Sequence, residues 1–552
     1  MPVLPTYPGV YIEELSSGVR TITGVATSIT AFIGRARKGP TDEAVQIFNF
    51  GDYERKFGGL WDKSTMSFAV RDFFLNGGGM AVIVRVHNGA LPAELRIPTG
   101  QPDPDDELNL VAVDPGTWGD KLGVTIDYNT KDKNAPLPDN KLFNITIIED
   151  GGLNEKFFNV TLDKTKSGYL PRVLEQGSTL VRVKKDAQGK DIMPAFRPLE
   201  TPKNVVVGPQ SPLASPPMSP VGSPPGAASS STDGSHIGDA QIFGAGMEAN
   251  KTGMFLLEKT DLFNILCIPP YTSSDPPTIT LDPDEKPTDV STDLIAAADA
   301  YCKKRRAFFI VDPHSTWKTM SDASDGLSTL VYPKLTSNYS GLFFPRLKQT
   351  NPLKKNQVEE FVPCGAVAGI FARTDGQRGV WKAPAGQDAT LVGVDQLSVP
   401  LTDSENGVLN QIGINCLRSF PVYGRLVWGA RTLEGADQLA SEWKYIPVRR
   451  TALFIEESLY RGTKWVVFEP NDEPLWAQIR LNIGAFMHNL FRQGAFQGKT
   501  PREAYLVKCD KETTTQNDIN SGIVNILVGF APLKPAEFVM IKIQQLAGQI
   551  ES

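Results

Sequence analysis

One short segment of the sequence has the residue types of a phosphate-binding loop. Gly494 is followed by Gly498, Lys499 and Thr500, but the two glycines lie four positions apart, where the phosphate loop has them five apart. The segment also follows a predicted helix, whereas a phosphate loop follows a strand so that its amide groups can surround the phosphates. We therefore interpret this segment as a turn and expect no nucleotide or other cofactor.

The side chains that most often perform catalysis or bind metals are dispersed along the chain. The four histidines are far apart in sequence, and neither a His-Glu-x-x-His motif nor a Gly-x-Ser-x-Gly motif is present. The five cysteines form no Cys-x-x-Cys pair, which fits small buried side chains in a reducing compartment. The acidic residues Asp282, Asp284 and Glu285 lack the glycine pattern of a calcium loop. We therefore predict no metal site, no catalytic residue and no enzyme.

Composition is that of an ordinary globular protein. The 552 residues allow about three to five domains at roughly 100–200 residues each. Lys and Arg number 56 and Asp and Glu number 62, so the net charge is −6, which argues against a general nucleic-acid binder. No apolar run approaches the roughly 20 residues that cross a bilayer, and the N-terminus lacks the features of a secretory signal. We expect a protein made in the cytoplasm, without nucleic-acid binding or membrane insertion.

Both ends of the chain carry short segments whose apolar residues alternate as in a strand. The N-terminal segment lies between a proline-rich start and a Ser/Gly/Thr-rich stretch, and the C-terminal segment follows further prolines. Each segment reads as a strand on an extended arm. The residues concerned are Tyr7, Val10, Tyr11, Ile12 and Glu13 at one end, and Val539, Ile541 and Ile543 at the other.

A lone strand at the periphery exposes unpaired N–H and C=O groups and invites pairing with another chain. Ordering the arm costs ~1–2 kcal/mol per residue, whereas each main-chain hydrogen bond returns only ~0.5–1.5 kcal/mol net. A short arm should therefore become ordered only when its apolar side chains are buried on a partner. The two ends predict a polymer of this chain with itself, woven by strand exchange.

Between the arms, predicted strands and helices alternate. Residues 27–33, a helix after Ser64 and residues 80–86 predict a β–α–β element. A helix after Ser291 and a strand at residues 307–311 continue the alternation. This order predicts a mixed α/β fold with a partly parallel sheet.

Composition changes within residues 91–250, where alternating stretches separated by Asp, Asn, Gly and Pro predict a mostly β insertion. Its loop 208–236 is rich in Pro, Ser and Gly and has too little apolar bulk to order itself. The predicted divisions are an N-terminal arm and linker (1–24), an α/β body (25–90 and 251–400), the insertion (91–250), a C-terminal α/β domain (401–530) and a C-terminal arm (531–552).

The C-terminal domain contains the most regular helical pattern of the chain. Residues 474–492 place six apolar side chains at helical spacing, from Trp476 to Leu490. Asn471 is the predicted cap of this helix, because acidic residues follow it in the first turn. Residues 465–468 predict a strand just before it.

Several blocks of the sequence closely resemble contractile tail sheath proteins, and they occur in the order found in that family. Residues 91–250 match no part of the family pattern. The blocks are YPGVYIEE at 7–14, GVATS at 24–28, AFIG at 31–34, RTALFIEES at 450–458 and WVVFEPND at 465–472.

The resemblance implies a structural function. Members of this family assemble as stacked rings around an inner tube, and the sheath then contracts to drive the tube through a target envelope. The resemblance implies that terminal strands join a sheet in neighbouring subunits and that residues 401–530 face the tube, with 91–250 outside. It also implies inner tube, baseplate and cap proteins as partners, in a phage tail or phage-tail-like particle that assembles in a bacterial cytoplasm and can be released.

For the contact with the inner tube we predict the polar side of helix 474–492, at Gln478, Arg480, Asn482 and Arg492. An alternative function is a surface module of a virion or particle whose insertion 91–250 binds glycan or protein. A third alternative, an enzyme with an unrecognised site, would need a cluster of titratable residues that the sequence does not suggest.

Overall fold

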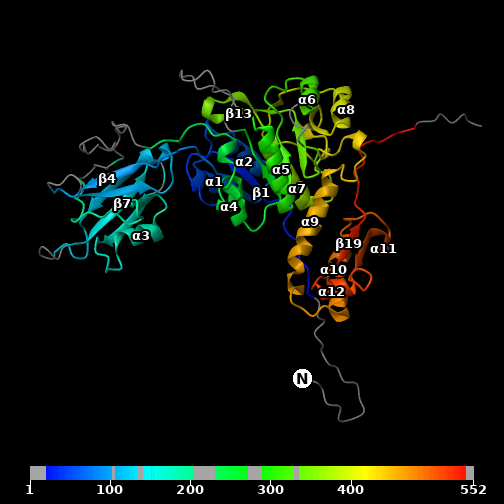
Figure 1. The fold of residues 1–552 in the computed structure, drawn as a ribbon. Coiled ribbons are helices and arrows are strands. Elements are labelled where there is room, and N and C mark those ends of the chain that lie inside the picture. The colour runs from blue at the N-terminus through cyan, green and yellow to red at the C-terminus, as the bar shows by residue number, and fades with distance from the viewer. Residues whose placement is uncertain are drawn as a thin grey trace, which may run out of the picture.

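The computed structural model describes residues 20–101, 106–134, 141–150, 152, 154–202, 208, 231–270, 289–328 and 335–542. In Figure 1 the described chain has a central part, a β-rich insertion on one side and a helical C-terminal unit on the other. The acidic run at 282–285 and loop residues 209–230 lie outside the described residues. So do the predicted arm residues Tyr7, Val10, Tyr11, Ile12, Glu13 and Ile543.

An eight-stranded sheet forms the central part. The strand order is β17-β16-β12-β11-β10-β1-β3-β2, and the six inner strands run parallel while β17 and β2 pair antiparallel at the edges. The prediction of a mixed α/β fold is confirmed. The strands are β1 (Thr30–Gly34), β2 (Val45–Ile47), β3 (Ala81–Arg85), β10 (Ile265–Cys267), β11 (Phe308–Val311), β12 (Ser340–Phe344), β16 (Ile414–Phe420) and β17 (Gly424–Val427).

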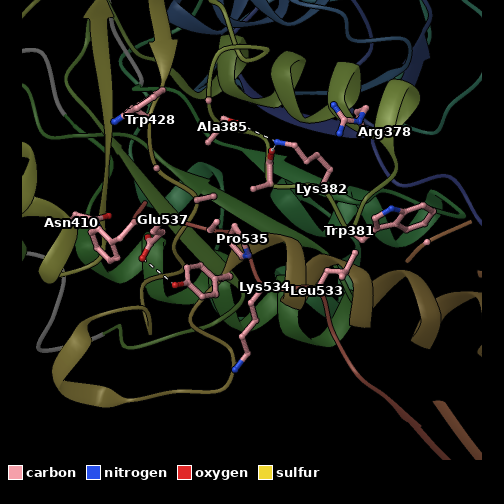
Figure 2. A pocket seen from close by; sticks show the side chains of 18 of the residues that line it. Arg378, Trp381, Lys382, Ala385, Asn410, Trp428, Leu533, Lys534, Pro535 and Glu537 are labelled. Atoms are coloured by element: carbon pink, nitrogen blue, oxygen red, sulfur yellow. Dashed lines mark hydrogen bonds between the residues drawn. The ribbon is translucent and has the colours of Figure 1, made fainter. Parts of the chain in front are cut away.

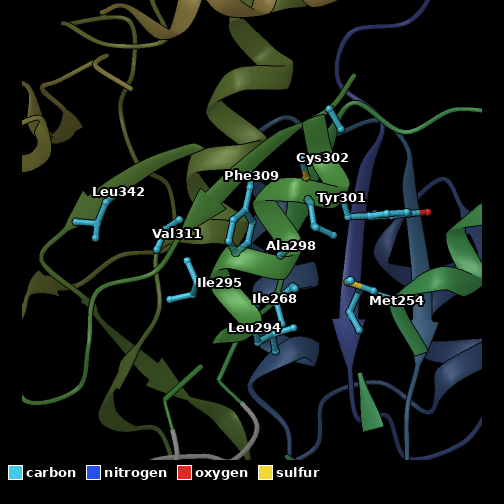
Figure 3. Close-up of a cluster of buried hydrophobic side chains, with 14 of the residues drawn as sticks. Met254, Ile268, Leu294, Ile295, Ala298, Tyr301, Cys302, Phe309, Val311 and Leu342 are labelled. Atoms are coloured by element: carbon cyan, nitrogen blue, oxygen red, sulfur yellow. The ribbon is translucent and has the colours of Figure 1, made fainter. Parts of the chain in front are cut away.

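Helices cover both faces of this sheet, which is why every residue of β1, β3 and β11 is buried. In Figure 3, Leu294, Ile295 and Ala298 of α5 lie against Phe309 and Val311 of β11. The helices on one face are α1 (Phe50–Phe57), α2 (Thr65–Leu75) and α7 (Cys364–Arg378). Those on the other are α5 (Thr292–Arg305), α6 (Met320–Gly326) and α8 (Asp403–Gln411).

Two glycines on α7 allow α2 and α7 to pack backbone to backbone. A Cβ atom at Gly365 would lie 2.0 Å from the carbonyl oxygen of Ala69, and one at Gly369 would lie 2.6 Å from that of Phe73. Any larger residue would therefore push the two helices apart. A small antiparallel sheet beside them consists of β13 (Leu347–Asn351), β14 (Gln357–Phe361) and β15 (Gln396–Leu397).

The insertion contains two three-stranded antiparallel sheets around a core of its own. The chain enters and leaves it side by side, because Leu91 and Thr232 exchange two backbone hydrogen bonds of 3.0 and 3.1 Å. The insertion is thus attached at one narrow neck. Its elements are β4 (Glu94–Pro98), β5 (Glu107–Ala112), β6 (Leu122–Asp127), β7 (Phe143–Glu149), β8 (Asn154–Val160), α3 (Leu170–Gly177) and β9 (Val181–Val183); the short α4 (Met247–Asn250) follows the neck.

The C-terminal unit packs around a further core that includes the apolar face of α10. The predicted boundary at residue 401 falls inside the central sheet instead, because β16 and β17 belong to that sheet. The elements of the unit are α9 (Ile446–Gly462), α10 (Glu473–Arg492), α11 (Pro501–Ala504), β18 (Tyr505–Lys508), α12 (Gln516–Asn520) and β19 (Leu527–Phe530).

Two details predicted for this unit are wrong. Residues 465–468 form no strand, since a 3-10 turn occupies Lys464–Val466 and Phe468 has a φ angle of 71°, which a strand cannot contain. The cap of α10 is Asp472 rather than Asn471. Asn471 instead accepts a 2.9 Å hydrogen bond from the indole N–H of Trp476 and so secures the preceding loop to the helix.

Buried arginines lie where the chain passes from one part of the molecule to another. Arg85, at the end of β3, donates to carbonyl oxygens of Ala36 (3.0 Å) and Gly39 (2.6 Å), and to Pro115 of the insertion (2.6 Å). Burial lowers the pKa of Arg85 to about 10, which leaves it charged at neutral pH. This side chain ties the insertion to the central sheet.

Arg450 of α9 joins the C-terminal unit to the central part in the same way. It forms an ion pair with Asp375 of α7, with an N–O distance of 2.6 Å, and both side chains are buried. It also donates a 2.9 Å hydrogen bond to the carbonyl oxygen of Thr27. One guanidinium therefore holds α7, α9 and the N-terminal segment together.

We expect Asp375→Asn to lower the free energy of unfolding by about 3–5 kcal/mol, because it leaves Arg450 buried without a compensating charge. Urea unfolding followed by tryptophan fluorescence measures the change. Asp388→Asn is the control, since the Asp388 ion pair with Arg378, near the end of the same α7, is exposed and should contribute under about 1 kcal/mol. Equal losses in the two variants would contradict the role given to Arg450.

Candidate assembly interface

The N-terminal segment is held firmly where it meets the C-terminal unit. The amide of Arg20 donates to the side-chain oxygen of Asn482 (3.0 Å), and the amide of Val25 donates to the hydroxyl of Ser458 (3.2 Å). Ile22 is buried in the core of the C-terminal unit. A Cβ atom at Gly24 would lie 2.8 Å from the ring of Phe454, so only glycine fits this approach. Residues 20–24, predicted to be part of a linker, thus lie against α9 and α10, with Ile22 buried and the other four residues exposed.

The chain after β19 crosses from the C-terminal unit back to the central part. It is first attached by the amide of Gln497, which donates to the carbonyl oxygen of Ala531 (2.9 Å). It is attached again at Glu537, whose two carboxylate oxygens accept 2.7 Å hydrogen bonds from Arg431. We call residues 531–537 the strap. The red segment that leaves the body in Figure 1 begins at its far end.

The carboxylate of Glu537 is ionised although it is half buried. Burial raises its pKa, but the hydrogen bonds and charge of Arg431, with the hydroxyl of Tyr445, outweigh burial and hold the pKa of Glu537 below its usual range. The contact therefore stabilises the strap at neutral pH and is lost only as the pH falls below the ordinary range of a glutamate.

Residues 538–541 follow the strap and carry four large apolar side chains that are exposed to solvent. Val539 and Ile541 are each 80% exposed, and Phe538 and Met540 are similarly open. Residues 538–543 were predicted as a strand, but within the described chain residues 538–542 pair with no other strand. A run of exposed apolar residues of this length is typical of a surface that another chain covers.

The C-terminal unit also contains a sheet that can accept further strands. Within the described residues, β18 and β19 form a two-stranded sheet. Leu506 on β18 and Leu527 on β19 are exposed. An isolated two-stranded hairpin is marginal in water, and additional strands on its open edges would stabilise it.

The four residues predicted to contact an inner tube do not share one surface. Gln478 and Arg492 are exposed on α10, and Arg480 is partly buried because it donates to the carbonyl of Cys509 and pairs with Glu473. Asn482 is buried, so its assignment to the polar side of the helix is wrong. It lies seven residues after Leu475, on the apolar face of α10.

A cavity of about 760 Å³ lies beneath the strap, between the central part and the end of α10. Figure 2 shows Leu533, Pro535 and Glu537 of the strap along it, with Trp381 and Lys382 among the residues opposite. The amino group of Lys382 donates to the carbonyl oxygen of Ala383 (2.9 Å), and burial lowers its pKa. These contacts serve the packing of the loop after α7.

A second cavity, of about 620 Å³, lies at the carboxyl ends of β10 and β11. Burial raises the pKa of Asp312 there to about 7, and its carboxylate accepts a 2.9 Å hydrogen bond from the amide of Cys364 at the start of α7. This bond fixes a helix end to the sheet. Among the described residues no group of three or more His, Cys, Asp or Glu side chains could hold a metal ion.

Other sequence predictions about chemistry can be checked directly. The segment from Gly494 to Thr500 is a turn between α10 and α11, as predicted, and the amide of Lys499 donates to Glu503 (2.8 Å). All five cysteines are free and buried, also as predicted. Within the described ranges, no helix combines the length and the apolar character that a bilayer span requires.

Comparison with known proteins gives one consistent result. Residues 273–433 match the family model of the phage tail sheath protein central domain, and residues 439–545 match that of the phage tail sheath C-terminal domain. A tail sheath protein of Vibrio phage KVP40 is 28% identical over 229 residues, which are 41% of this chain and 32% of that protein. The chain spans less than half the length of the curated tail sheath proteins that it matches.

Solved structures with the same fold extend over nearly the whole chain. The sheath complex of an extracellular contractile injection system (PVC), in its contracted state, is 20% identical with a TM-score of 0.56, and the match covers 99% of both chains. A structure of the anti-feeding prophage baseplate contains a chain that is 21% identical with a TM-score of 0.53, over 98% of this chain and 99% of that one. Residues 273–433 and 439–545 of this chain are thus similar to the central and C-terminal domains of the phage tail sheath family.

Proposed function

We propose that this protein is a structural subunit of a contractile sheath. Copies polymerise as stacked rings around an inner tube, and the sheath contracts to drive the tube through a target envelope. The observation that carries the proposal is the exposed apolar segment 538–541, which has no strand partner among the described residues of its own chain. The family of the chain and the contracted sheath among its structural neighbours support it.

Copies are joined by strand exchange in this proposal. The arm beginning at residue 538 pairs with the sheet β18–β19 of a neighbouring copy, and Val539, Ile541 and Ile543 face its apolar surface. The N-terminal arm, with Tyr7, Val10, Tyr11, Ile12 and Glu13, adds another strand. The open two-stranded sheet and its exposed leucines supply the receiving surface.

The main-chain terms of a single arm contact nearly cancel. Ordering four residues costs about 4–8 kcal/mol, and their main-chain hydrogen bonds return ~0.5–1.5 kcal/mol each. Burial of the apolar side chains must therefore supply the net gain, and this gain also has to offset the translational and rotational freedom lost on association. A stable sheath arises because each copy is held by several such contacts at once.

We propose further partners on the same basis. The inner tube lies against the C-terminal unit, where Gln478 and Arg492 present exposed polar groups on α10, whereas Arg480 is engaged with Cys509 and Glu473. Baseplate and cap proteins bind the two ends of the sheath. The structural neighbour from a baseplate supports the baseplate as a partner. The particle assembles in the bacterial cytoplasm, and the subunit binds no nucleic acid, inserts into no membrane and has no catalytic activity.

Removal of residues 1–19 should leave a folded monomer that forms no long tubes, because the contacts of Arg20, Ile22 and Val25 remain while the arm is lost. Circular dichroism measures folding and negative-stain microscopy measures tube formation. The full-length chain is the control and should form hollow striated cylinders. Normal cylinders from the truncated chain would contradict strand exchange by the N-terminal arm.

The double variant Val539→Asp/Ile541→Asp should abolish tubes without lowering the melting temperature of the monomer. Both side chains are exposed in the single chain, but strand exchange would bury two unpaired carboxylates, which costs several kcal/mol. Met540→Asp is the matched control, because alternation along a strand places Met540 on the opposite face. A light-scattering assay measures assembly of both variants. Equal inhibition of assembly by the two variants would contradict the assignment of Val539 and Ile541 to the buried face of the arm.

Replacement of residues 92–231 by a short Gly-Ser linker should leave assembly intact, because Leu91 and Thr232 are already adjacent. Sedimentation of polymers by the shortened chain measures the result. This variant also tests the alternative that the insertion binds glycan or protein as a surface module. If the insertion is instead a binding module, the shortened chain loses binding to target cells. In that case neither the full-length chain nor the shortened chain forms a sheath.

A further inference from the structure

The side chain of Arg431 is fully buried and forms an unusually large number of hydrogen bonds. It is 0% exposed, and its own backbone is fixed by Asn415, which accepts from the Arg431 amide (2.6 Å) and donates to the Arg431 carbonyl (2.7 Å). Its guanidinium donates to the carbonyl of Asn410 (2.7 Å) and to Asp437 (2.9 Å). These contacts hold the side chain rigidly before the strap is considered.

The other two guanidinium nitrogens of Arg431 face the strap. Nε and Nη2 donate to the two oxygens of Glu537, each at 2.7 Å, in the bidentate geometry that arginine forms with carboxylates. The hydroxyl of Tyr445 donates to the same carboxylate at 3.0 Å. A lysine could not replace this arrangement, since a single ammonium group cannot make two parallel bonds while satisfying the other acceptors.

The position of Glu537 in the chain explains how its ion pair with Arg431 affects the C-terminal arm. The residue is the last attached residue of the strap, and residues 538–541 after it are exposed. The previous attachment is at Ala531 and Pro532, on the C-terminal unit, where Pro532 forms a β-bridge with Phe496. The ion pair therefore moves the point at which the arm leaves the molecule from the C-terminal unit to the central part.

We propose that Arg431 is a positioning residue for assembly: by holding Glu537 it fixes the exit point and direction of the C-terminal arm, so that residues 538–541 meet a neighbouring copy already oriented. The proposal rests on the proposed function. Without the ion pair, five more residues (533–537) join the free arm. Binding to a neighbour would then have to order them as well, and the advantage of a preorganised arm would be lost.

Glu537→Gln tests the proposal. The change is isosteric and removes the charge at the less buried partner, so the fold is kept, whereas a change of Arg431 itself would disturb Asn415 and Asn410 as well. Lys534→Gln is the matched control, because Lys534 is an exposed charged residue on the same strap. Each variant carries spin labels on cysteines introduced at the exposed positions Ser404 on α8 and Lys542 on the arm.

Distances between the two labels are measured by pulsed electron spin resonance in dilute protein, and the critical concentration for polymer formation is measured by sedimentation. We expect a narrow distance distribution in the wild-type chain and in Lys534→Gln. Glu537→Gln should broaden the distribution at least twofold and raise the critical concentration at least tenfold, with only a small decrease in melting temperature, because Asp437 still balances the charge of Arg431.

A narrow distribution in Glu537→Gln would overturn the proposal, and so would a broad distribution with an unchanged critical concentration. Failure of the proposed function gives a different result. In that case the wild-type chain forms no polymer at all, while the label distances still report whether Arg431 holds the arm.

Discussion

A guanidinium group taken out of water must have its N–H donors satisfied and its charge balanced, and three arginines meet this demand where the parts of the molecule join. Arg85 bonds carbonyl groups of the central part and the insertion. Arg450 bonds α7 and the N-terminal segment, and Arg431 bonds the strap. The bonds of Arg450 to Asp375 and of Arg431 to Glu537 are bidentate, and such bonds fix direction as well as distance. The separate cores alone would leave those orientations loose.

Rigid junctions suit the proposed assembly, in which the ends of one subunit pair with other copies. An arm that left the molecule from a mobile domain would sample many directions, and each contact with a neighbour would carry a larger entropic cost. Here the described ends of the chain are both clamped before they reach solvent, at residues 20–25 and at Glu537. In the proposed assembly the arms would leave from these defined points, and weak individual contacts can add up over a polymer.

Patterns that depend on local chemistry could be predicted from the sequence. The alternation of β-branched strands with capped helices indicated the α/β sheet, and the apolar spacing of residues 474–492 indicated α10. The register of α10 was harder. Asn482 has a polar side chain, but its position relative to Leu475 and Ile479 places it on the buried face, where its side-chain oxygen accepts a hydrogen bond from the Arg20 amide. The spacing of Asn482 from the apolar residues of the helical repeat was the signal in the sequence that indicated its burial.

Features that depend on distant partners could not be predicted. Residues 465–468 contain four apolar or aromatic side chains in a row, which favours a strand, but the backbone turns there and Asn471 secures the loop to α10. The boundary at residue 401 was misplaced because β16 joins a sheet whose other strands lie earlier in the chain. The contact between Arg431 and Glu537 joins residues 106 positions apart, and neither shows a motif.

The narrow attachment of the insertion affects how this part of the protein can change during evolution. Since Leu91 and Thr232 already meet as neighbours in a ladder, the chain enters and leaves the insertion at one place, and side-chain contacts such as Arg85 with Pro115 and Lys38 with Glu149 add to that connection. Any compact module with closely spaced termini could be grafted there, which is the situation in which circular permutation and domain insertion are tolerated. The insertion is thereby free to diversify in sequence, while the central sheet and the C-terminal unit keep their geometry.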